Sequence, residues 1–204
     1  DNSIIFLLSL NSISIILLNH DWTIDENSSL ETSFGYQFGE MGNSRWDYAG
    51  GANPSPAYYQ DLPSYFLADT NGPDYEGAYI AQENFVNNGQ INWNRIYDAN
   101  LTNNQSNLNA AYVLYEDRVD DTQLTVNSAY NREINENIKI TTSVNYRNLV
   151  SDNFAEITDM LGGYSYSNID SFDNLDYNLL SPNSVVSHGD KFKYHYEMNA
   201  EELS

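Results

Sequence analysis

The chain contains no cysteine in its 204 residues, and it has only eight Lys and Arg against 29 Asp and Glu. Without cysteine, neither a disulfide framework nor a thiolate metal site can form. The formal net charge of −21 argues against nucleic-acid binding, because a phosphate backbone is held by clustered cations that this chain lacks. The same shortage of cations argues against a basic helix that lies on a membrane surface.

Enzyme motifs are missing as well. The sequence has no GxSxG nucleophile elbow, no phosphate-binding P-loop and no GxGxxG followed by a helix. Its three histidines, His20, His188 and His195, show no metal-ligand spacing. We therefore expect no enzymatic activity and no cofactor.

The most apolar stretch, SIIFLLSLNSISIILL at residues 3–18, lacks the features of a signal peptide. No basic residue precedes it, and no small-residue cleavage site follows it. Asn11, Ser12 and Ser14 interrupt it, so it falls short of the roughly 18–20 apolar residues that a transmembrane helix needs. Its β-branched residues favour a strand or hairpin, with a helix or a targeting segment as the alternatives.

A thirteen-residue phrase occurs twice, as IDENSSLETSFGY from Ile24 and as INENIKITTSVNY from Ile134. Each copy begins with a short polar turn, and around each turn every second residue is apolar, as in a strand with one apolar face. We therefore predict two β-hairpins, at about residues 13–38 and 112–147. Their apolar positions are Ile16, Leu18, Trp22, Ile24, Leu30, Phe34, Tyr36 and Phe38, then Leu124, Val126, Tyr130, Ile134, Ile138, Ile140, Val144 and Tyr146.

The connections between the predicted strands are very unequal. Short turns join the strands of each hairpin, whereas long loops without periodicity are predicted at about 39–110 and 148–190, before a final strand at about 191–199. Outer-membrane barrels combine short periplasmic turns, long extracellular loops and strands of about 9–11 residues. We therefore predict an all-β fold: antiparallel up-and-down strands of a partial transmembrane β-barrel of about five strands. A soluble β-sandwich or barrel is the alternative.

Aromatic residues fall at both ends of the apolar strand segments, where the interfacial girdles of a membrane barrel lie. Trp22 and Tyr130 are toward the turns, and Tyr36, Phe38 and Tyr146 are toward the long loops. We predict that these five side chains belong to the girdles.

The long loops are rich in aromatic residues interleaved with Asn, Asp and Gln. Flat rings supply contact area and carboxamides supply hydrogen bonds, a combination suited to sugar faces or to peptides. Packing of each loop against itself is the alternative. The candidate ligand-binding residues are Trp46, Tyr48, Tyr58, Tyr59, Tyr65, Trp93 and Tyr97.

One acidic segment, DTNGPDYEG, places Asp69, Asn71, Asp74 and Glu76 around a glycine. Oxygen ligands at such spacing make it a weak calcium candidate, although it lacks the twelve-residue spacing and the terminal bidentate Glu of an EF-hand. A solvated turn accounts for the same residues, so we predict no metal site with these ligands.

The segments HDWTIDENSSLETSFGY and NREINENIKITTSVNYR resemble the barrel of a TonB-dependent outer-membrane receptor. The likeness is to the Bacteroidota type that carries a carboxypeptidase-regulatory-like domain and includes the starch-utilisation-type (SusC/RagA-like) transporters. It covers about residues 19–204 and rests on the order and number of such phrases, among them GQINWNRIYDAN and YVLYEDRVDDTQLTVNSAYN.

The resemblance implies an energised importer in the outer membrane of a bacterium: a barrel of about 22 strands with an internal plug, driven by TonB. Its implied partners are outer-membrane lipid, TonB through a region absent here, and a surface lipoprotein. Because a plug and a TonB-contacting segment are missing, we expect an internal fragment whose loops help to capture a glycan, a peptide or a chelate. The alternatives are a secreted, soluble β-rich glycan-binding module and an acidic adhesive surface protein.

Overall fold

The computed structural model describes residues 9–68, 70, 72–168 and 184–204. The chain forms two compact units. Unit 1 consists of Asp1–Arg45, Tyr115–Glu156 and Asp190–Ser204, and unit 2 consists of Trp46–Leu114 and Ile157–Gly189. Unit 1 is built from strands, whereas the helices of the described residues all fall in unit 2.

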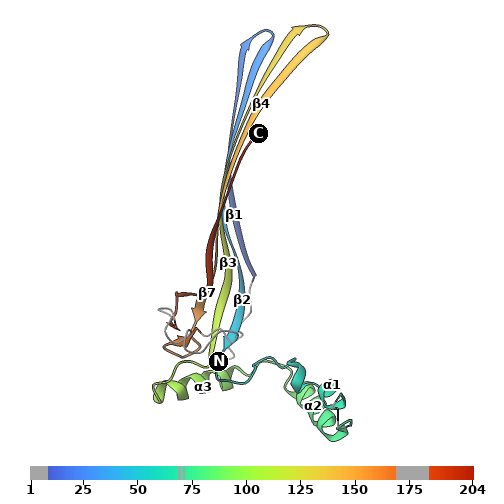
Figure 1. The fold of residues 1–204 in the computed structure, drawn as a ribbon, viewed down its shortest axis with the longest axis vertical. Coiled ribbons are helices and arrows are strands. Elements are labelled where there is room, and N and C mark those ends of the chain that lie inside the picture. Colours follow the sequence, from blue (N-terminus) through green and yellow to red (C-terminus); the bar gives the residue numbers. More distant parts are fainter. Residues whose placement is uncertain (1–8, 69, 71, 169–183) are drawn as a thin grey trace. The chain divides into compact units, whose positions relative to one another are not determined.

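Five antiparallel strands form one sheet in the order β1-β2-β3-β4-β7 (Figure 1). They are β1 (Ser9–Asp25), β2 (Ser28–Tyr48), β3 (Tyr112–Asn135), β4 (Ile138–Asp159) and β7 (Lys191–Leu203). Across the described residues the sheet is open, with β1 and β7 at its edges. The predicted antiparallel β structure is confirmed, including a strand at residues 9–18; residues 1–8 lie outside the described residues.

The two copies of the repeated phrase form the same two-residue hairpin turn. Glu26 and Asn27 connect β1 to β2, and Glu136 and Asn137 connect β3 to β4. In both turns the last strand residue accepts a bond from the asparagine N–H through its side-chain Oδ1, at 2.8 Å in the first turn and 3.0 Å in the second. Such side-chain acceptors stabilise tight turns, which is why one short phrase specifies both corners.

The first turn differs from the second in having an ionisable acceptor, Asp25, where the second has Asn135. The pKa of Asp25 lies below its ordinary value of 3.8, chiefly because the N–H of Asn27 bonds to the carboxylate. A lowered pKa means that folding favours the charged form, so this stabilisation is complete above the unfolded pKa and is lost as pH falls through the folded pKa.

Acidification is therefore expected to weaken the first turn and to leave the second unchanged. The amide proton shifts of Asn27 and Asn137, followed by NMR from about pH 6 to about pH 2, measure this directly. Asp25→Asn retains an acceptor oxygen without the titration and should abolish the difference. An Asn27 titration that persists in Asp25→Asn would show that another group is responsible.

The strand register places the apolar side chains of neighbouring strands on one face. Leu18 lies opposite Phe34, and Trp22 lies opposite Leu30. The hydroxyls of Thr32 and Ser128 meet at 3.2 Å, which puts the even-numbered residues of β2 and β3 on the same face. We call the even-numbered residues 16–24, 30–38, 124–134 and 138–146 the apolar band. The alternation predicted around both turns is confirmed.

The opposite face is polar and cross-linked between strands. Thr141 donates to the side chain of Asn131 at 2.8 Å, and Arg147 Nε donates to Gln123 at 3.0 Å. Lys139 forms an ion pair with Glu133 on the same face. On β2, β3 and β4 the odd-numbered residues thus form a hydrogen-bonded polar surface behind the apolar band. β1 is the exception, because Ile13, Ile15 and Leu17 are exposed apolar residues at odd positions.

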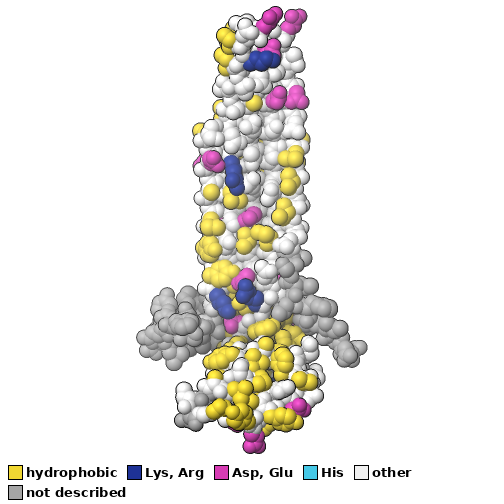
Figure 2. All heavy atoms as spheres, turned by 90° about the vertical axis from the view of Figure 1, so that its right-hand side faces the viewer, with side chains coloured by type: hydrophobic (Ala, Val, Ile, Leu, Met, Phe, Trp, Pro, Cys, Tyr) yellow, Lys and Arg dark blue, Asp and Glu magenta, His cyan; other side chains and the backbone are white. Residues whose placement is uncertain are grey.

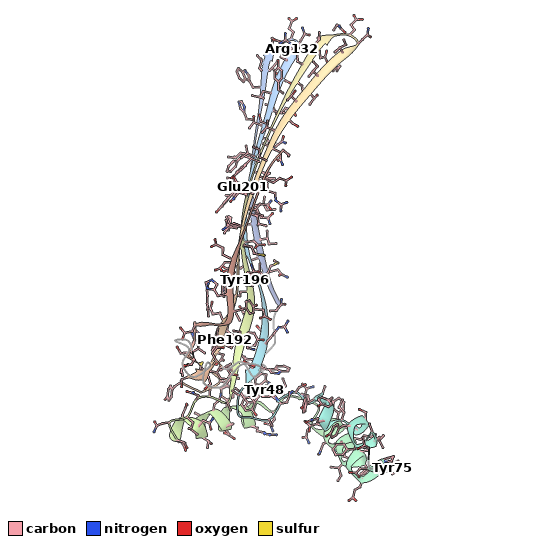
Figure 3. All side chains as sticks on the ribbon, viewed as in Figure 1. Tyr48, Tyr75, Arg132, Phe192, Tyr196 and Glu201 are labelled. Carbon is pink, nitrogen blue, oxygen red and sulfur yellow. The ribbon has the colours of Figure 1, made fainter. Side chains whose placement is uncertain are left out.

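Charged residues replace the apolar ones farther from the turns. On β2, Phe38 is followed at the next even position by Glu40, which pairs with Arg118 at 2.9 Å. Arg118 also bonds to Asp120 at 3.1 Å. Near the turns, Arg132 is the single cation within the band, and Figure 3 places it at the hairpin end of the sheet. The apolar band therefore has a charged border on the side away from the turns.

The strands extend well beyond the predicted hairpins, so two loop predictions are wrong in part. β2 continues to Tyr48 and β4 to Asp159, inside the segments predicted as loops at 39–110 and 148–190. Apolar and polar residues stop alternating in these extensions, where apolar neighbours such as Leu149–Val150 and Phe154–Ala155 occur together. β7 also continues past residue 199, to Leu203, and Leu203 lies opposite Tyr146 on the apolar face, whereas Tyr196 lies opposite Asn153 on the other face.

The first long connection, predicted as a loop without periodicity, contains helices. They are η1 (Tyr59–Asp61), α1 (Pro63–Leu67), α2 (Tyr75–Asn87) and α3 (Trp93–Gln105). Capping residues start the two longer helices: Asp74 accepts from the N–H of Gly77 at 2.9 Å, and Asn92 accepts from the N–H of Arg95 at 3.0 Å. Asp and Asn are favoured residues at helix N-caps. In the sequence these two residues are predicted to lie in a loop, because Asn and Asp are also common there.

Asn100 on α3 is the central polar residue of unit 2, and its side chain is fully buried. Its Nδ2 donates to the carbonyls of Tyr112, Met160 and Leu161 at 2.8–3.1 Å, and its Oδ1 accepts from the N–H groups of Ala111 and Tyr112 at 2.8 and 3.1 Å. One side chain therefore joins α3 to the start of β3 and to the turn after β4. Unit 2 also contains a small two-stranded sheet, β5 (Tyr166–Ser167) with β6 (Val185–Val186).

Candidate functional site

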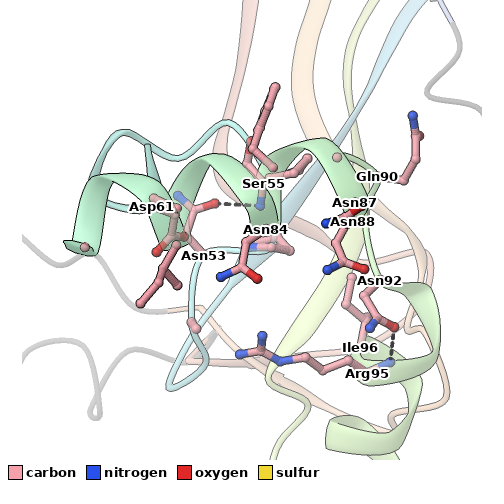
Figure 4. Close-up of a pocket in the computed structure, with 18 of the residues that line it drawn as sticks. Asn53, Ser55, Asp61, Asn84, Asn87, Asn88, Gln90, Asn92, Arg95 and Ile96 are labelled. Carbon is pink, nitrogen blue, oxygen red and sulfur yellow. Dashed lines mark hydrogen bonds between the residues drawn. The ribbon is translucent and has the colours of Figure 1, made fainter. Parts of the chain in front are cut away.

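A polar cleft of about 870 Å³ is the candidate binding site of unit 2. It lies among the segment 52–56, helices α1 and α2, the turn 87–90 and the start of α3 (Figure 4). The volume is within the range of small-molecule sites. Its lining residues are Ala52, Asn53, Pro54, Ser55, Pro56, Asp61, Phe66, Gly77, Ile80, Ala81, Asn84, Phe85, Asn87, Asn88, Gly89, Gln90, Asn92, Arg95, Ile96 and Tyr112.

Local structure explains how the walls are held. α1 and α2 pack against each other (Figure 1), and Gly77 is required at that contact because a Cβ there would lie 2.5 Å from the ring of Phe66. On the other side, the hydroxyl of Tyr112 donates to the carbonyl of Ala52 at 2.8 Å and fixes the segment that follows β2. Asn53 is committed to the wall, because its Oδ1 accepts from the N–H of Ser55 at 2.9 Å.

Other carboxamides of the lining remain available to a ligand. Asn84, Asn87, Asn88 and Gln90 have exposed side chains that make no hydrogen bond within the described residues. Figure 4 shows the side chains of Asn84, Asn88 and Arg95 around a common space. A carboxamide both donates and accepts, so this group can bind a ligand that offers both kinds of hydrogen-bonding atom.

Arg95 supplies the only positive side chain of the cleft. It is also the only Lys or Arg in the two segments that form unit 2, where eleven Asp and Glu occur. Despite this excess of acid, Arg95 has no ion pair among the described residues. In unit 1, by contrast, Arg45, Arg118, Lys139 and Lys191 all pair with carboxylates.

All seven predicted loop aromatics belong to unit 2, but none of them lines the cleft. Three form a run of ring contacts: the ring centroids of Tyr58 and Tyr59 are 5.0 Å apart, those of Tyr59 and Tyr65 5.9 Å, and those of Tyr65 and Phe66 5.6 Å. Burial, followed by the neighbouring Tyr59, raises the pKa of Tyr58. Phe66 also lines the cleft, so the run ends at its wall.

The remaining four aromatics lie elsewhere, and no ring contact within the described residues joins them to that run. Trp46 and Tyr48 end β2, and the Tyr48 hydroxyl accepts from Asn53 at 3.1 Å. Trp93 and Tyr97 are on α3. Burial, with a smaller effect of Asp159, raises the pKa of Tyr97. The seven predicted ligand-binding residues are therefore not assembled into a single site.

The weak calcium candidate is only partly visible, because Asp69 and Asn71 lie outside the described residues. Asp74 caps α2, and Glu76 follows in the first turn. The described residues contain no group of three or more His, Cys, Asp or Glu side chains arranged to hold a metal ion. Helix capping by Asp74 and the favourable position of Glu76 near the helix N-terminus explain the presence of these two acidic residues without a metal ion.

The five predicted girdle residues all lie on the apolar face of unit 1. Tyr36 and Phe38 are in ring contact at 5.6 Å, Trp22 lies opposite Leu30, and Tyr146 lies opposite Leu203. Tyr130 is on β3, in the even-numbered series of Ser128. The described part of the chain holds no helix that combines the length and the apolarity needed to cross a membrane.

None of the residues that line the cleft is among the ligand-binding residues predicted from the sequence. The phrase NNGQINWNR contains Asn87, Asn88, Gln90, Asn92 and Arg95, but it reads as turn composition. The usable signal was the lone arginine in a long acidic segment. Comparison with other proteins adds no assignment: no family model matches the chain, and neither a curated protein nor a solved structure matches it.

Proposed function

We propose that this chain is part of the wall of an outer-membrane β-barrel receptor that takes up a glycan, a peptide or a chelate with energy supplied through TonB. The observation that supports this most is the apolar band on one face of the sheet. It begins at the two-residue turns and is bordered by charged residues at its far end. Behind it, the odd-numbered residues of β2, β3 and β4 form a polar face, as the lumen side of such a barrel requires, whereas β1 has Ile13, Ile15 and Leu17 there.

The height of the band fits a membrane. On β3 it runs from Ile134 to Leu124, ten residue steps, or roughly 33 Å along the strand at about 3.3 Å per residue. A strand tilted by about 40° covers roughly 25 Å of that length along the membrane normal, which is the height of the apolar belt of outer-membrane barrels. The charged group of Glu40, Arg118 and Asp120 then falls just beyond the hydrocarbon.

The exposure of the band favours lipid over water. Ile16 is 51% exposed, Leu18 62% and Val144 54%. On the face of the sheet that Figure 2 shows, by contrast, most of the surface is neither hydrophobic nor charged, and hydrophobic, acidic and basic side chains are scattered over it. A soluble protein covers such a stripe with a second layer, and contiguous apolar surface of this kind in water promotes association. This is why we prefer the membrane receptor to the secreted glycan-binding module.

The long connections support a role in substrate capture. They follow β2 and β4, at the strand ends opposite the two-residue turns, and they contain the polar cleft. In outer-membrane barrels, long connections of this kind face the exterior. TonB and a plug would act through parts of a longer protein, and a surface lipoprotein is the proposed outer partner. The resemblance of residues 19–204 to TonB-dependent receptors supports the same assignment.

Detergent dependence tests the proposal. We expect the purified chain to aggregate in buffer, and to become monodisperse and β-rich by circular dichroism in detergent micelles. Lipids brominated in their acyl chains should quench Trp22 at the band; a Trp46→Phe, Trp93→Phe double variant isolates its signal because the chain has three tryptophans. A monodisperse, cooperatively melting monomer in plain buffer, unquenched by brominated vesicles, would contradict the proposal and favour the soluble module.

A further inference from the structure

The backbone of Arg95 is fixed in the structure of unit 2, but its side chain forms no ion pair within the described residues. Its backbone N–H bonds to the cap residue Asn92 at 3.0 Å, and the next residue, Ile96, is buried. One turn farther along, Asn100 fixes α3 to the core of the unit. The base of the Arg95 side chain is therefore rigid, while its guanidinium lies in an open cleft and has no ion pair among the described residues.

An unpaired guanidinium is notable in so acidic a unit. Long-range attraction from eleven carboxylates favours ion pairs with the one available cation, yet none forms within the described residues. Guanidinium groups bind carboxylates through two parallel hydrogen bonds, and such bonds are stronger than those between neutral groups. The cleft thus offers one strong site for a carboxylate, and no carboxylate of the described residues fills it.

The remaining lining determines the rest of the ligand. Free carboxamides at Asn84, Asn88 and Gln90 provide donors and acceptors side by side, which matches neighbouring hydroxyl groups. Phe85 adds apolar surface to the same cleft. The acidic surroundings repel ligands with several negative charges, so a single carboxylate fits better than phosphates or sulfates.

We propose that the cleft binds a hydroxyl-rich ligand with one carboxylate, the chemistry of an oligosaccharide that contains a uronic acid. Arg95 binds the carboxylate, and the carboxamides of Asn84, Asn88 and Gln90 bind hydroxyl groups. This inference rests on the proposed role of the long connections in substrate capture, and it specifies the class of substrate that they select.

Calorimetric titration of the full chain in detergent tests this with three matched ligands: a xylo-oligosaccharide bearing one glucuronic acid, its methyl ester, and the unsubstituted oligosaccharide. The acid should bind about tenfold more tightly than either neutral form, as expected for a charge-assisted pair. Arg95→Gln should remove this preference and leave binding of the neutral sugars unchanged. Arg132→Gln, which removes a cation from unit 1, is the control and should behave like the unaltered chain.

Two further variants separate a binding role from a folding role. Arg95→Lys keeps the charge but lacks the two-pronged geometry, so it should retain part of the preference. Asn88→Ala should weaken all three sugars to a similar extent. Circular dichroism must show unchanged helix content in each variant.

Several results would overturn the inference. Equal affinity for the acid and its ester would contradict carboxylate binding by Arg95. Absence of sugar binding at millimolar concentration would contradict the proposed sugar site. Arg95-dependent binding of a short peptide through its C-terminal carboxylate, without sugar binding, would replace the ligand class. If the chain binds none of the sugars but still depends on detergent, the sugar site is contradicted and the barrel proposal is not. If a soluble monomer binds the sugars, the barrel proposal is contradicted and the sugar site is not.

Discussion

Replacing Asn100 with alanine is expected to unfold unit 2 or to lower its free energy of unfolding by about 3–5 kcal/mol, since each buried backbone group left without a partner costs about 1–3 kcal/mol. The substitution removes one hydrogen bond from each of three carbonyls and two N–H groups, although the Met160 carbonyl keeps its bond from the N–H of Gly163 at 2.8 Å. Part of this loss is recovered if water enters the space left by the side chain. Asn100→Asp should be at least as damaging, because its second oxygen faces the same carbonyls.

The turn after β4 makes the effect larger than that of an ordinary buried asparagine. Leu161 has a φ of 48°, in the left-handed region that non-glycine residues seldom adopt. Its carbonyl is held by Asn100 at 3.0 Å, and its N–H is held by Asp159 at 2.7 Å. Loss of the first bond leaves a strained residue with less to maintain its conformation.

Chemical denaturation followed by the helical signal at 222 nm measures the change, because the described helices all belong to unit 2. Asn94→Ala is the matched control: it lies on the same helix, is exposed and makes no side-chain hydrogen bond within the described residues. Hydrogen exchange at the amides of Ala111 and Tyr112 should accelerate in Asn100→Ala alone. A loss below about 1 kcal/mol would show that the five bonds contribute little beyond an average one.

Replacing Phe34 with arginine is expected to destabilise the membrane-inserted chain by about 2–4 kcal/mol, the cost of an arginine on the lipid face of a barrel at the middle of the bilayer. Phe34 lies at the centre of the stretch from Leu30 to Phe38, opposite Leu18. The neighbouring Ser33 lies opposite Asn19 on the polar face. Ser33→Arg introduces the same charge one residue away, and it should therefore change stability little.

Flotation with lipid vesicles after refolding compares the two variants. Phe34→Arg should reduce the inserted fraction strongly, and Ser33→Arg should leave it near that of the unaltered chain. Equal losses in both variants would mean that the two faces are not distinguished by the membrane. The reverse order would place lipid on the polar face and contradict the barrel orientation.

The two hairpins could be predicted from the sequence because their information is local. Asp25 and Asn135 bond to the amide two residues later, so neither turn depends on distant residues. Period-two alternation then assigns each side chain to a face, and a shift by one residue would expose the whole apolar set to the other side. Under these conditions a short segment of sequence determines its own local structure.

The strand ends and the helices could not be predicted in the same way. Beyond Phe38 and Tyr146 apolar and polar residues no longer alternate, as in Leu149–Val150 and Phe154–Ala155, so the sequence pattern no longer distinguishes a strand from a loop. α2 and α3 are rich in Asn and Tyr, residues of modest helix propensity, and packing is what holds them: Ala78 and Ala81 are buried in α2, and Ile96 and Asn100 in α3. Such helices are stabilised mainly by contacts that no local pattern reveals.

The site divides along the same line. Composition pointed to the long connections and to their aromatic residues, and all seven of the predicted residues do lie in unit 2. It could not show that Tyr58, Tyr59 and Tyr65 contact one another while the cleft is lined by carboxamides from α2 and by Arg95 from α3. The position of an aromatic residue in the sequence does not determine which other residues contact it in the folded protein.

By itself, the sequence determined the charge of the protein, its two turns and the alternation of its strands, because each of these depends on neighbours within a few residues. Only the tertiary structure decided how far the strands continue, which segments become helices and where Arg95 stands without an ion pair among the described residues. Those features depend on contacts such as the bonds from Asn100 to Met160 and Leu161, some 60 residues apart in the chain. Contacts between residues so far apart in the sequence leave no local pattern, so only the folded structure shows them.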